Sequence, residues 1–235
     1  MKTIKYIITM VLVLVAVKAC FYIKNGMATS PASDNLSGTA PAKEWQRLSN
    51  ASVNEGIHSG FVRHNLGYGL SLDVPEDWYI LTGGQVSQIE AAADDVYGGG
   101  PDKRTAFAAN SSRDPNASEA QYRVSFVEKQ FDENALQSAT SEDLRAGCED
   151  IYNSWLQNPP TPNPIGRPQC SVVMFNGKAA LLTSYQRNGR SNSVWDVNIV
   201  QIPLANNGVM ITFSNMAGSL TAEEAITRIN SSLKF

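Results

Sequence analysis

The sequence predicts an α+β fold: a single antiparallel β-sheet, rich in meander connections and flanked by helices, behind an N-terminal membrane-targeting segment. Three observations support this prediction. Asn-Gly dipeptides at 176–177, 188–189 and 207–208 separate four strand-like runs, as the turns of β-hairpins do. Apolar residues recur at helical spacing over 144–155 and 222–233. The chain also opens with a basic and then apolar segment.

Residues 1–24 are predicted to be a signal peptide or an N-terminal membrane anchor. Lys2 and Lys5 precede an apolar run over 6–17, which Lys18 then interrupts. The uninterrupted run matches the apolar part of an export signal and is shorter than a full membrane span. The segment therefore directs the protein to a membrane, and how it is processed there stays open.

Three routes of processing fit this segment. Residues 4–23 could stay as a membrane anchor, with Lys18 at the boundary reaching the headgroups. Cys20 could become the lipidated first residue of a lipoprotein, although the charge of Lys18 departs from lipoprotein signals. Ordinary cleavage could follow Ala19 or Ala28. Each route places the body on the periplasmic or extracytoplasmic side of the cell envelope, because the positive end stays inside.

Composition divides the rest of the chain into a flexible linker over 25–56 and one domain over 57–235. The linker is small, polar and aperiodic. Of the 235 residues 43% are hydrophobic and 17% are charged, which suits one medium domain. After residue 24 the chain carries 15 basic and 22 acidic residues, a balance of −7. So acidic a body argues against binding to nucleic acid.

Alternating apolar and polar residues predict short strands in the first half of the domain. They lie over 70–74, 78–81 and 122–126, and a further strand is expected next to them over 104–109. In the first of these, Leu72 is expected to face the core, Asp73 to face the other side, and Pro75 to end the strand. A helix is predicted over 86–96, because apolar residues at helical spacing end there at three glycines.

A second helix is predicted from Thr140 to Asn158. Thr140 and Asp143 have the spacing of a capping box, and the apolar residues that follow lie on one helical face. That face consists of Leu144, Cys148, Ile151 and Trp155. Five prolines follow between 159 and 168, which excludes a helix and an inner strand from this stretch.

The last third predicts a meander followed by a helix. Its four strands are expected over 169–175, 178–187, 192–204 and 209–215. Thr221 is the predicted cap of the final helix. The apolar face of this helix consists of Ala222, Ala225, Ile226, Ile229 and Leu233.

Two cysteines of the body, Cys148 and Cys170, are predicted to form a disulfide. Cys20 belongs to the export segment, so these two remain as an even pair in an oxidising compartment. The alternative is that Cys148 is a small buried residue on its helix. A paired cysteine cannot act as a nucleophile, which disfavours a cysteine-dependent enzyme.

No catalytic, cofactor-binding or metal site is predicted. The only histidines, His58 and His64, lack the further ligands that zinc needs, and no Gly-x-Ser-x-Gly elbow accompanies them. A weak binding patch is predicted at Tyr185 and Trp195, which lie on neighbouring strands and would share a face. An exported hydrolase of unrecognised type remains the alternative function, since carboxylates distant in sequence can meet through folding.

The run that opens the domain resembles the first hairpin of the PsbP-like superfamily, whose members show an alternating strand, then Pro, two residues and Trp. It reads Gly69-Leu70-Ser71-Leu72-Asp73-Val74-Pro75-Glu76-Asp77-Trp78. The resemblance extends to the order of elements over 57–235. It implies a helix-flanked antiparallel sheet and a non-enzymatic binding or accessory role in an exported or lipid-anchored protein. The expected partners are the membrane, through the N-terminal segment, and an envelope protein or small ligand.

Overall fold

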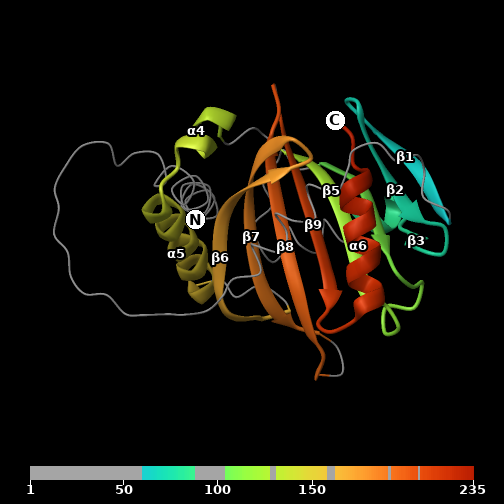
Figure 1. Cartoon of the computed structure of the whole chain (residues 1–235). Helices are drawn as coiled ribbons and strands as arrows, with labels where there is room; N and C mark the ends of the chain where they lie inside the picture. Colours follow the sequence, from blue (N-terminus) through green and yellow to red (C-terminus); the bar gives the residue numbers. More distant parts are fainter. Residues whose placement is uncertain (1–59, 88–103, 128–130, 158–161, 190–191, 206) are drawn as a thin grey trace, which may run out of the picture.

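Seven strands form one antiparallel sheet in the computed structural model, in the order β3-β4-β5-β9-β8-β7-β6 (Figure 1). The described residues are 60–87, 104–127, 131–157, 162–189, 192–205 and 207–235. The strands are β3 (Tyr79–Ile80), β4 (Arg104–Asn110), β5 (Ala120–Val127), β6 (Pro164–Phe175), β7 (Lys178–Asn188), β8 (Val194–Pro203) and β9 (Gly208–Met216). The helices are α4 (Glu133–Ser138), α5 (Ser141–Gln157) and α6 (Leu220–Ser232). The predicted α+β class, with helices flanking an antiparallel sheet, is confirmed.

The predicted export segment over 1–24 and the linker over 25–56 lie outside the described residues. The helix predicted over 86–96 lies mostly outside them as well. Its first turn is described and is helical over 83–87, where Thr82 and Gln85 cap one another. Within the described part of the chain, no helix is long and apolar enough to cross a membrane.

All three Asn-Gly dipeptides lie at connections between antiparallel strands, as predicted. Only the first forms a two-residue turn, in which Asn176 has φ 47° and Gly177 has φ 78°. In the second connection the positive φ falls at Asn192 (60°), and the Gly189 N–H donates to the Ser193 carbonyl (2.7 Å). Asn and Gly therefore marked the hairpins correctly, while the loop lengths depend on the strands they join.

The core lies between one face of the sheet and helix α6, which lies beside β5 and β9 in Figure 1. Tyr122 pairs with Phe213, and Val124 pairs with Ile211, so these four side chains share that face. Ile226 and Ile229 of α6 are buried against the same cluster. This helix begins at Ser219, whose hydroxyl accepts from the Ala222 N–H (3.4 Å). The prediction of Thr221 as the cap was wrong, because Thr221 already lies within the first turn.

Asn230 fixes α6 to the sheet through polar contacts. Tyr122 is fully buried, which raises the pKa of its phenol, and its hydroxyl donates to Asn230 Oδ1 (2.8 Å). Asn176, in the β6–β7 turn, donates through Nδ2 to the carbonyls of Asn230 (2.7 Å) and Leu233 (3.0 Å). The bond to Leu233 satisfies a carbonyl at the helix end, and the bond to Asn230 adds a second donor to a carbonyl that also accepts from the Leu233 N–H (3.4 Å).

A separate two-stranded sheet, β1 (Phe61–Gly67) with β2 (Leu70–Pro75), covers the other end of the core. The sequence had predicted one sheet, so this hairpin is an addition to it. Leu70, Leu72 and Val74 face the core as predicted. The edge of β2 that β1 leaves free is partly covered, because Lys234 pairs with Ser71 through two backbone hydrogen bonds.

Strand β6 begins at Pro164, five residues before the predicted start at Gln169. It is an edge strand, where proline is tolerated because one side of the backbone has no neighbour. Its register with β7 shifts between Ile165 and Gln169, around Pro168. The expectation that the proline-rich stretch forms neither a helix nor an inner strand is therefore confirmed for the described residues.

Candidate functional site

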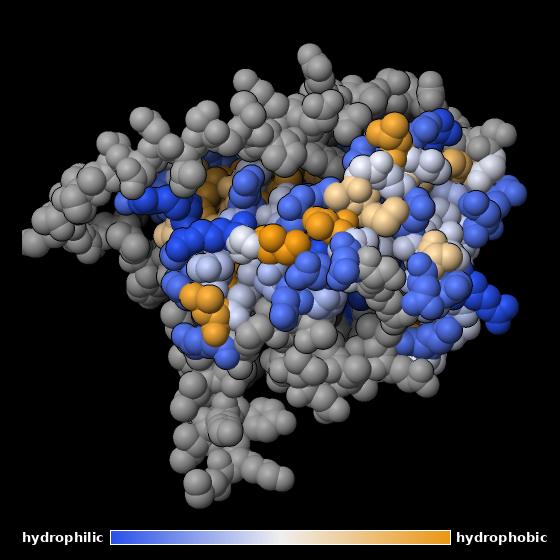
Figure 2. Space-filling view, turned by 90° about the horizontal axis from the view of Figure 1, so that it is seen from below, coloured by the Kyte–Doolittle hydropathy of each residue, from blue (hydrophilic) through white to orange (hydrophobic). Residues whose placement is uncertain are grey.

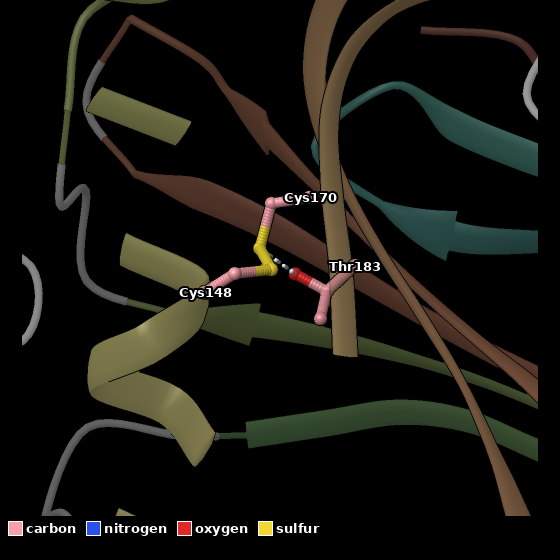
Figure 3. The surroundings of a disulfide bond; sticks show 3 residues. All are labelled: Cys148, Cys170 and Thr183. Carbon is pink, nitrogen blue, oxygen red and sulfur yellow. Dashed lines mark hydrogen bonds between the residues drawn. A yellow bond between two sulfur atoms is a disulfide. The ribbon is translucent and has the colours of Figure 1, made fainter. Parts of the chain in front are cut away.

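The disulfide predicted between Cys148 and Cys170 is present, with an S–S distance of 2.05 Å and a Cα–Cα distance of 5.8 Å. Figure 3 shows it joining helix α5 to strand β6 beside Thr183, whose hydroxyl lies 3.9 Å from Cys170 Sγ. The Thr140–Asp143 capping box that starts α5 is also confirmed, with N–H donors 2.9 Å and 3.2 Å from their acceptors. The Thr140 N–H and the Thr140 hydroxyl both donate to the Asp143 carboxylate, and these two bonds lower its pKa.

Helix α5 contacts the sheet through the disulfide and through partly buried side chains, among them Glu149, which forms an ion pair with Arg167 of β6. Of its side chains only Cys148 is buried. The Trp155 indole meets the Tyr185 ring edge to face at 4.8 Å, and the Arg167 guanidinium lies 4.5 Å from the Tyr152 ring centre. The disulfide is the covalent link between this helix and the strands.

Tyr185 and Trp195 share the sheet face opposite α6, as predicted. Arg187 pairs with Trp195 across β7 and β8, and Tyr185 is two residues from Arg187 on the same strand. Trp195 is only 7% exposed, and the Arg187 guanidinium lies 5.1 Å from its ring centre. Trp195 is therefore largely covered by its contact with Arg187. A role of Tyr185 and Trp195 in binding stays a prediction.

Gly189 makes room for this indole. A Cβ atom at this position would overlap Trp195 Cδ1 and Nε1 and the Ser193 hydroxyl. We therefore expect Gly189→Ala to displace the indole and to lower the free energy of unfolding by about 1 to 3 kcal/mol. Urea unfolding followed by tryptophan fluorescence measures both effects. Gly84→Ala is the control, since a Cβ there meets no atom within 4 Å; equal stability of the two variants would refute the clash.

Arg187 extends from β7 toward β5 on this face. Its Nη2 donates to Gln121 Oε1 (3.3 Å) and, at longer range, to the Ser214 hydroxyl (3.5 Å). Arg123 lies two residues from Gln121, so the two side chains leave β5 on the same face. Arg123, Arg187, Gln121 and Ser214, together with Trp195, are called the arginine cluster below.

Both arginines of this cluster are half-buried. Burial lowers the pKa of Arg123, and the neighbouring charge of Arg187 lowers it further. Burial also lowers the pKa of Arg187, against an opposing effect of Tyr185. Like charges so placed destabilise one another, and hydrogen-bond donors that could receive an anion converge here.

Sequence reasoning did not identify Arg123 or Arg187 as site residues. The alternation over 122–126 marks Arg123 only as a polar residue between apolar ones on its strand. One signal was available, since an arginine in the middle of a strand faces a half-covered surface. The partners of Arg187 lie 66 and 27 residues away, so no local pattern could have shown them.

The exposed surface offers no continuous apolar area in the described part that Figure 2 shows. In this view from below, hydrophobic residues appear as small groups between hydrophilic ones. The large exposed apolar residues are also spread over the described part of the fold. They are Val62, Tyr68, Ile80, Leu156, Ile165, Met174, Leu220 and Phe235. A polar cluster is therefore a better candidate than an apolar patch for recognition.

Known proteins give only distant similarity. No protein-family model matches the chain, and no curated protein matches it. Similar solved structures include a Bacteroides thetaiotaomicron protein, with a TM-score of 0.39, 11% identity, and coverage of 70% of this chain and 44% of that one. LpqN, involved in cell envelope biogenesis of Mycobacterium tuberculosis, gives a TM-score of 0.38 and 16% identity over 74% of this chain and 89% of its own.

Pseudomonas aeruginosa PA94 is a third similar structure, with a TM-score of 0.30 and 15% identity over 73% of this chain and 91% of its own. The chain thus spans less than half of the Bacteroides protein and nine-tenths of the other two. At these scores the likeness carries no argument about activity. The residues of the chain itself must supply that argument.

His64 occupies a packed position on β1, and His58 lies outside the described residues. The His64 ring centre lies 5.4 Å from that of Phe107, and no group of metal-binding side chains forms within the described ranges. Burial lowers the pKa of His64 from 6.5, and the charge of Asp73 opposes this shift. The ring therefore favours its neutral form in the folded protein.

Stability is expected to depend on the protonation of His64. Below pH 6.5 the unfolded chain binds a proton at this residue more readily than the folded protein does. The contribution is therefore complete above pH 6.5 and is lost as the pH falls through the lower pKa of the folded state. Urea unfolding on both sides of this pH should show a smaller loss in His64→Gln than in the wild type. An identical loss in both would contradict the assignment.

Proposed function

We propose that this chain is a cell-envelope protein whose PsbP-like domain, residues 57–235, acts as a non-catalytic binding or accessory module. Residues 4–23, or a lipidated Cys20, hold it to a membrane, with the domain on the extracytoplasmic side. The arginine cluster is the observation that carries the binding role. Arginine and tryptophan are enriched where proteins bind their partners, and a half-buried cationic site needs an anionic one.

Two further features support the envelope location. The Cys148–Cys170 disulfide fits an oxidising compartment outside the cytoplasm. The basic and apolar start of the chain fits export and membrane attachment. The PsbP-like assignment is supported by the opening run over 69–78 and by a meander that leads into a C-terminal helix.

Crosslinking in cells, followed by membrane fractionation and mass spectrometry, tests this proposal. We expect the protein in the membrane fraction, with crosslinks to a specific partner that are lost when Arg187 is replaced by Gln. Mass spectrometry of the same digest identifies the mature N-terminus and any lipid on Cys20. A soluble, uncrosslinked protein would overturn the proposal. So would a hydrolytic activity that His64→Gln abolishes.

A further inference from the structure

We propose that Arg123 and Arg187 form a binding site for a phosphate group. The inference rests on the proposed function, since it names the class of ligand that the binding module takes. Arg123 has no acceptor among the described residues, Arg187 lies on the same sheet face with only part of its donors used there, and a tetrahedral anion can accept from both.

Arg123 is a half-buried cation without a counterion among the residues that the structure describes. Its guanidinium takes part in none of the hydrogen bonds, ion pairs or ring contacts found among the described residues. Arg63 shows how the same protein treats another partly buried arginine, because Asp73 and the Ser232 carbonyl both accept from it. A cation removed from water without such acceptors lowers stability unless a bound anion offsets the cost.

Arg187 adds a second positive charge to the same place. Among the described residues only its Nη2 donates to protein acceptors, Gln121 and Ser214, so no described acceptor takes the remaining N–H groups of the guanidinium. The Arg187 guanidinium makes a cation–π contact with Trp195, whose ring centre lies 5.1 Å from Cζ. The guanidinium is therefore already oriented before any ligand arrives, which reduces the entropy lost on binding.

No carboxylate of the described residues neutralises the two arginines. The side chains that register places around them on this face are Ala108, Asn110, Gln121, Trp195, Thr212 and Ser214. Asp196 is held on the opposite face, where it accepts from Gln186 (2.9 Å). Asn110, opposite Gln121, keeps a buried Oδ1 that lacks a hydrogen-bond partner within the described ranges. Hydrogen bonding among the polar side chains on this face is therefore incomplete among the described residues.

A phosphate group matches this arrangement better than a single carboxylate. Two guanidinium groups carry two positive charges, which a phosphate dianion neutralises and a carboxylate does not. Its oxygens point in tetrahedral directions, so separate oxygens can accept from Arg123 and from Arg187 at once. The hydroxyls of Thr212 and Ser214, paired with Arg123 and Gln121, lie beside them as further donors.

Binding of inorganic phosphate to the full chain tests the site. Titration calorimetry, together with thermal unfolding in phosphate and in chloride of equal ionic strength, should show binding and a raised midpoint. Arg123→Gln and Arg187→Gln should each weaken binding by about tenfold or more, because each removes a charge-assisted hydrogen-bonding group. The matched control is Arg104→Gln, which removes the same charge from an exposed position on β4 and should bind as the wild type does.

A second measurement separates a ligand site from a structural role. In chloride, Arg123→Gln should unfold at the same temperature as the wild type or higher, because the repulsion from Arg187 is gone. A structural arginine would give a lower midpoint, and that result would overturn the proposal. So would phosphate binding that all three variants share.

Vesicles of phosphatidic acid in phosphatidylcholine provide a third arm. Binding to these vesicles without binding to inorganic phosphate, lost in Arg123→Gln, would identify the phosphate group as a lipid headgroup. Failure to bind either probe would overturn the phosphate site. It would leave the proposed function intact if the crosslinked partner is still found, so the two failures are distinguishable.

Discussion

Asp73→Ala is expected to lower the free energy of unfolding by about 3 to 5 kcal/mol, the largest effect of any single substitution considered for this protein. Asp73 is only 1% exposed, and Arg63 opposite it on β1 is 20% exposed. Arg63 Nη2 donates to Asp73 Oδ2 (3.0 Å), and Nε forms an ion pair with Oδ1. Removing the carboxylate leaves the buried guanidinium without its counterion, and the cost of that desolvation is no longer offset.

The same pair joins the β1–β2 hairpin to the end of α6. The Asp73 N–H donates to the Ser232 hydroxyl (2.8 Å), and Arg63 Nη1 donates to the Ser232 carbonyl (3.1 Å). Loss of Asp73 therefore loosens a contact between segments 159 residues apart. We expect hydrogen exchange to rise in β1 and in the last turn of α6 before it rises in β8 or β9.

Urea unfolding of the purified full chain measures this effect. Glu224→Ala is the control, because Glu224 and Arg228 form an exposed ion pair one turn apart on α6, and its loss should cost about 0.5 kcal/mol or less. The double variant Arg63→Met, Asp73→Leu should regain much of the lost stability, since it leaves no charge buried. An Asp73→Ala variant no less stable than Glu224→Ala would show that the pair contributes nothing.

Removal of the disulfide is expected to cost about 3 kcal/mol, from the entropy of an unfolded chain no longer closed over a 22-residue separation. The effect should be local as well as global. Cys148 is the one buried side chain of α5, so the helix loses its covalent link to the strands. We expect Cys148→Ala, Cys170→Ala to lose hydrogen-exchange protection throughout α5, with little change in β7 to β9.

Reduction provides an independent check of the same effect. A reductant should lower the urea midpoint of the wild type toward that of the double variant, and should leave the double variant unchanged. The Trp155–Tyr185 contact should weaken in parallel, which tryptophan fluorescence reports. Unaltered protection of α5 after reduction would show that packing alone holds the helix.

Most elements of the fold were predictable because their signals are local. Alternation predicted β2 and β5, and Asn-Gly dipeptides predicted the three hairpins of the meander. The capping box predicted the start of α5, where Thr140 and Asp143 exchange hydrogen bonds. The cap of α6 was misplaced by two residues, because Ser219 and Thr221 are both suitable caps and only the backbone path chooses between them.

The candidate site was less predictable, because its residues come from distant strands. The sequence placed Tyr185 and Trp195 on one face, and the register agrees. It could not show that Trp195 is buried beneath Arg187, because that depends on the direction in which the long Arg187 side chain extends from β7 over β8. It likewise expected Asp73 only to face away from the core, whereas Arg63 and the end of α6 bury it.

The sequence by itself determined an α+β domain with a C-terminal meander and helix, and it paired two cysteines on the grounds of count and compartment. Periodicity and turn chemistry act over a few residues, and the redox environment acts on the whole chain, so all three can be inferred from the sequence. Only the tertiary structure decided which charged side chains have partners. Arg63 meets Asp73, whereas Arg123 meets no acid within the described ranges and lies beside Arg187. Electrostatic pairing depends on distances of a few ångströms between segments far apart in sequence, which a pattern along the chain cannot encode.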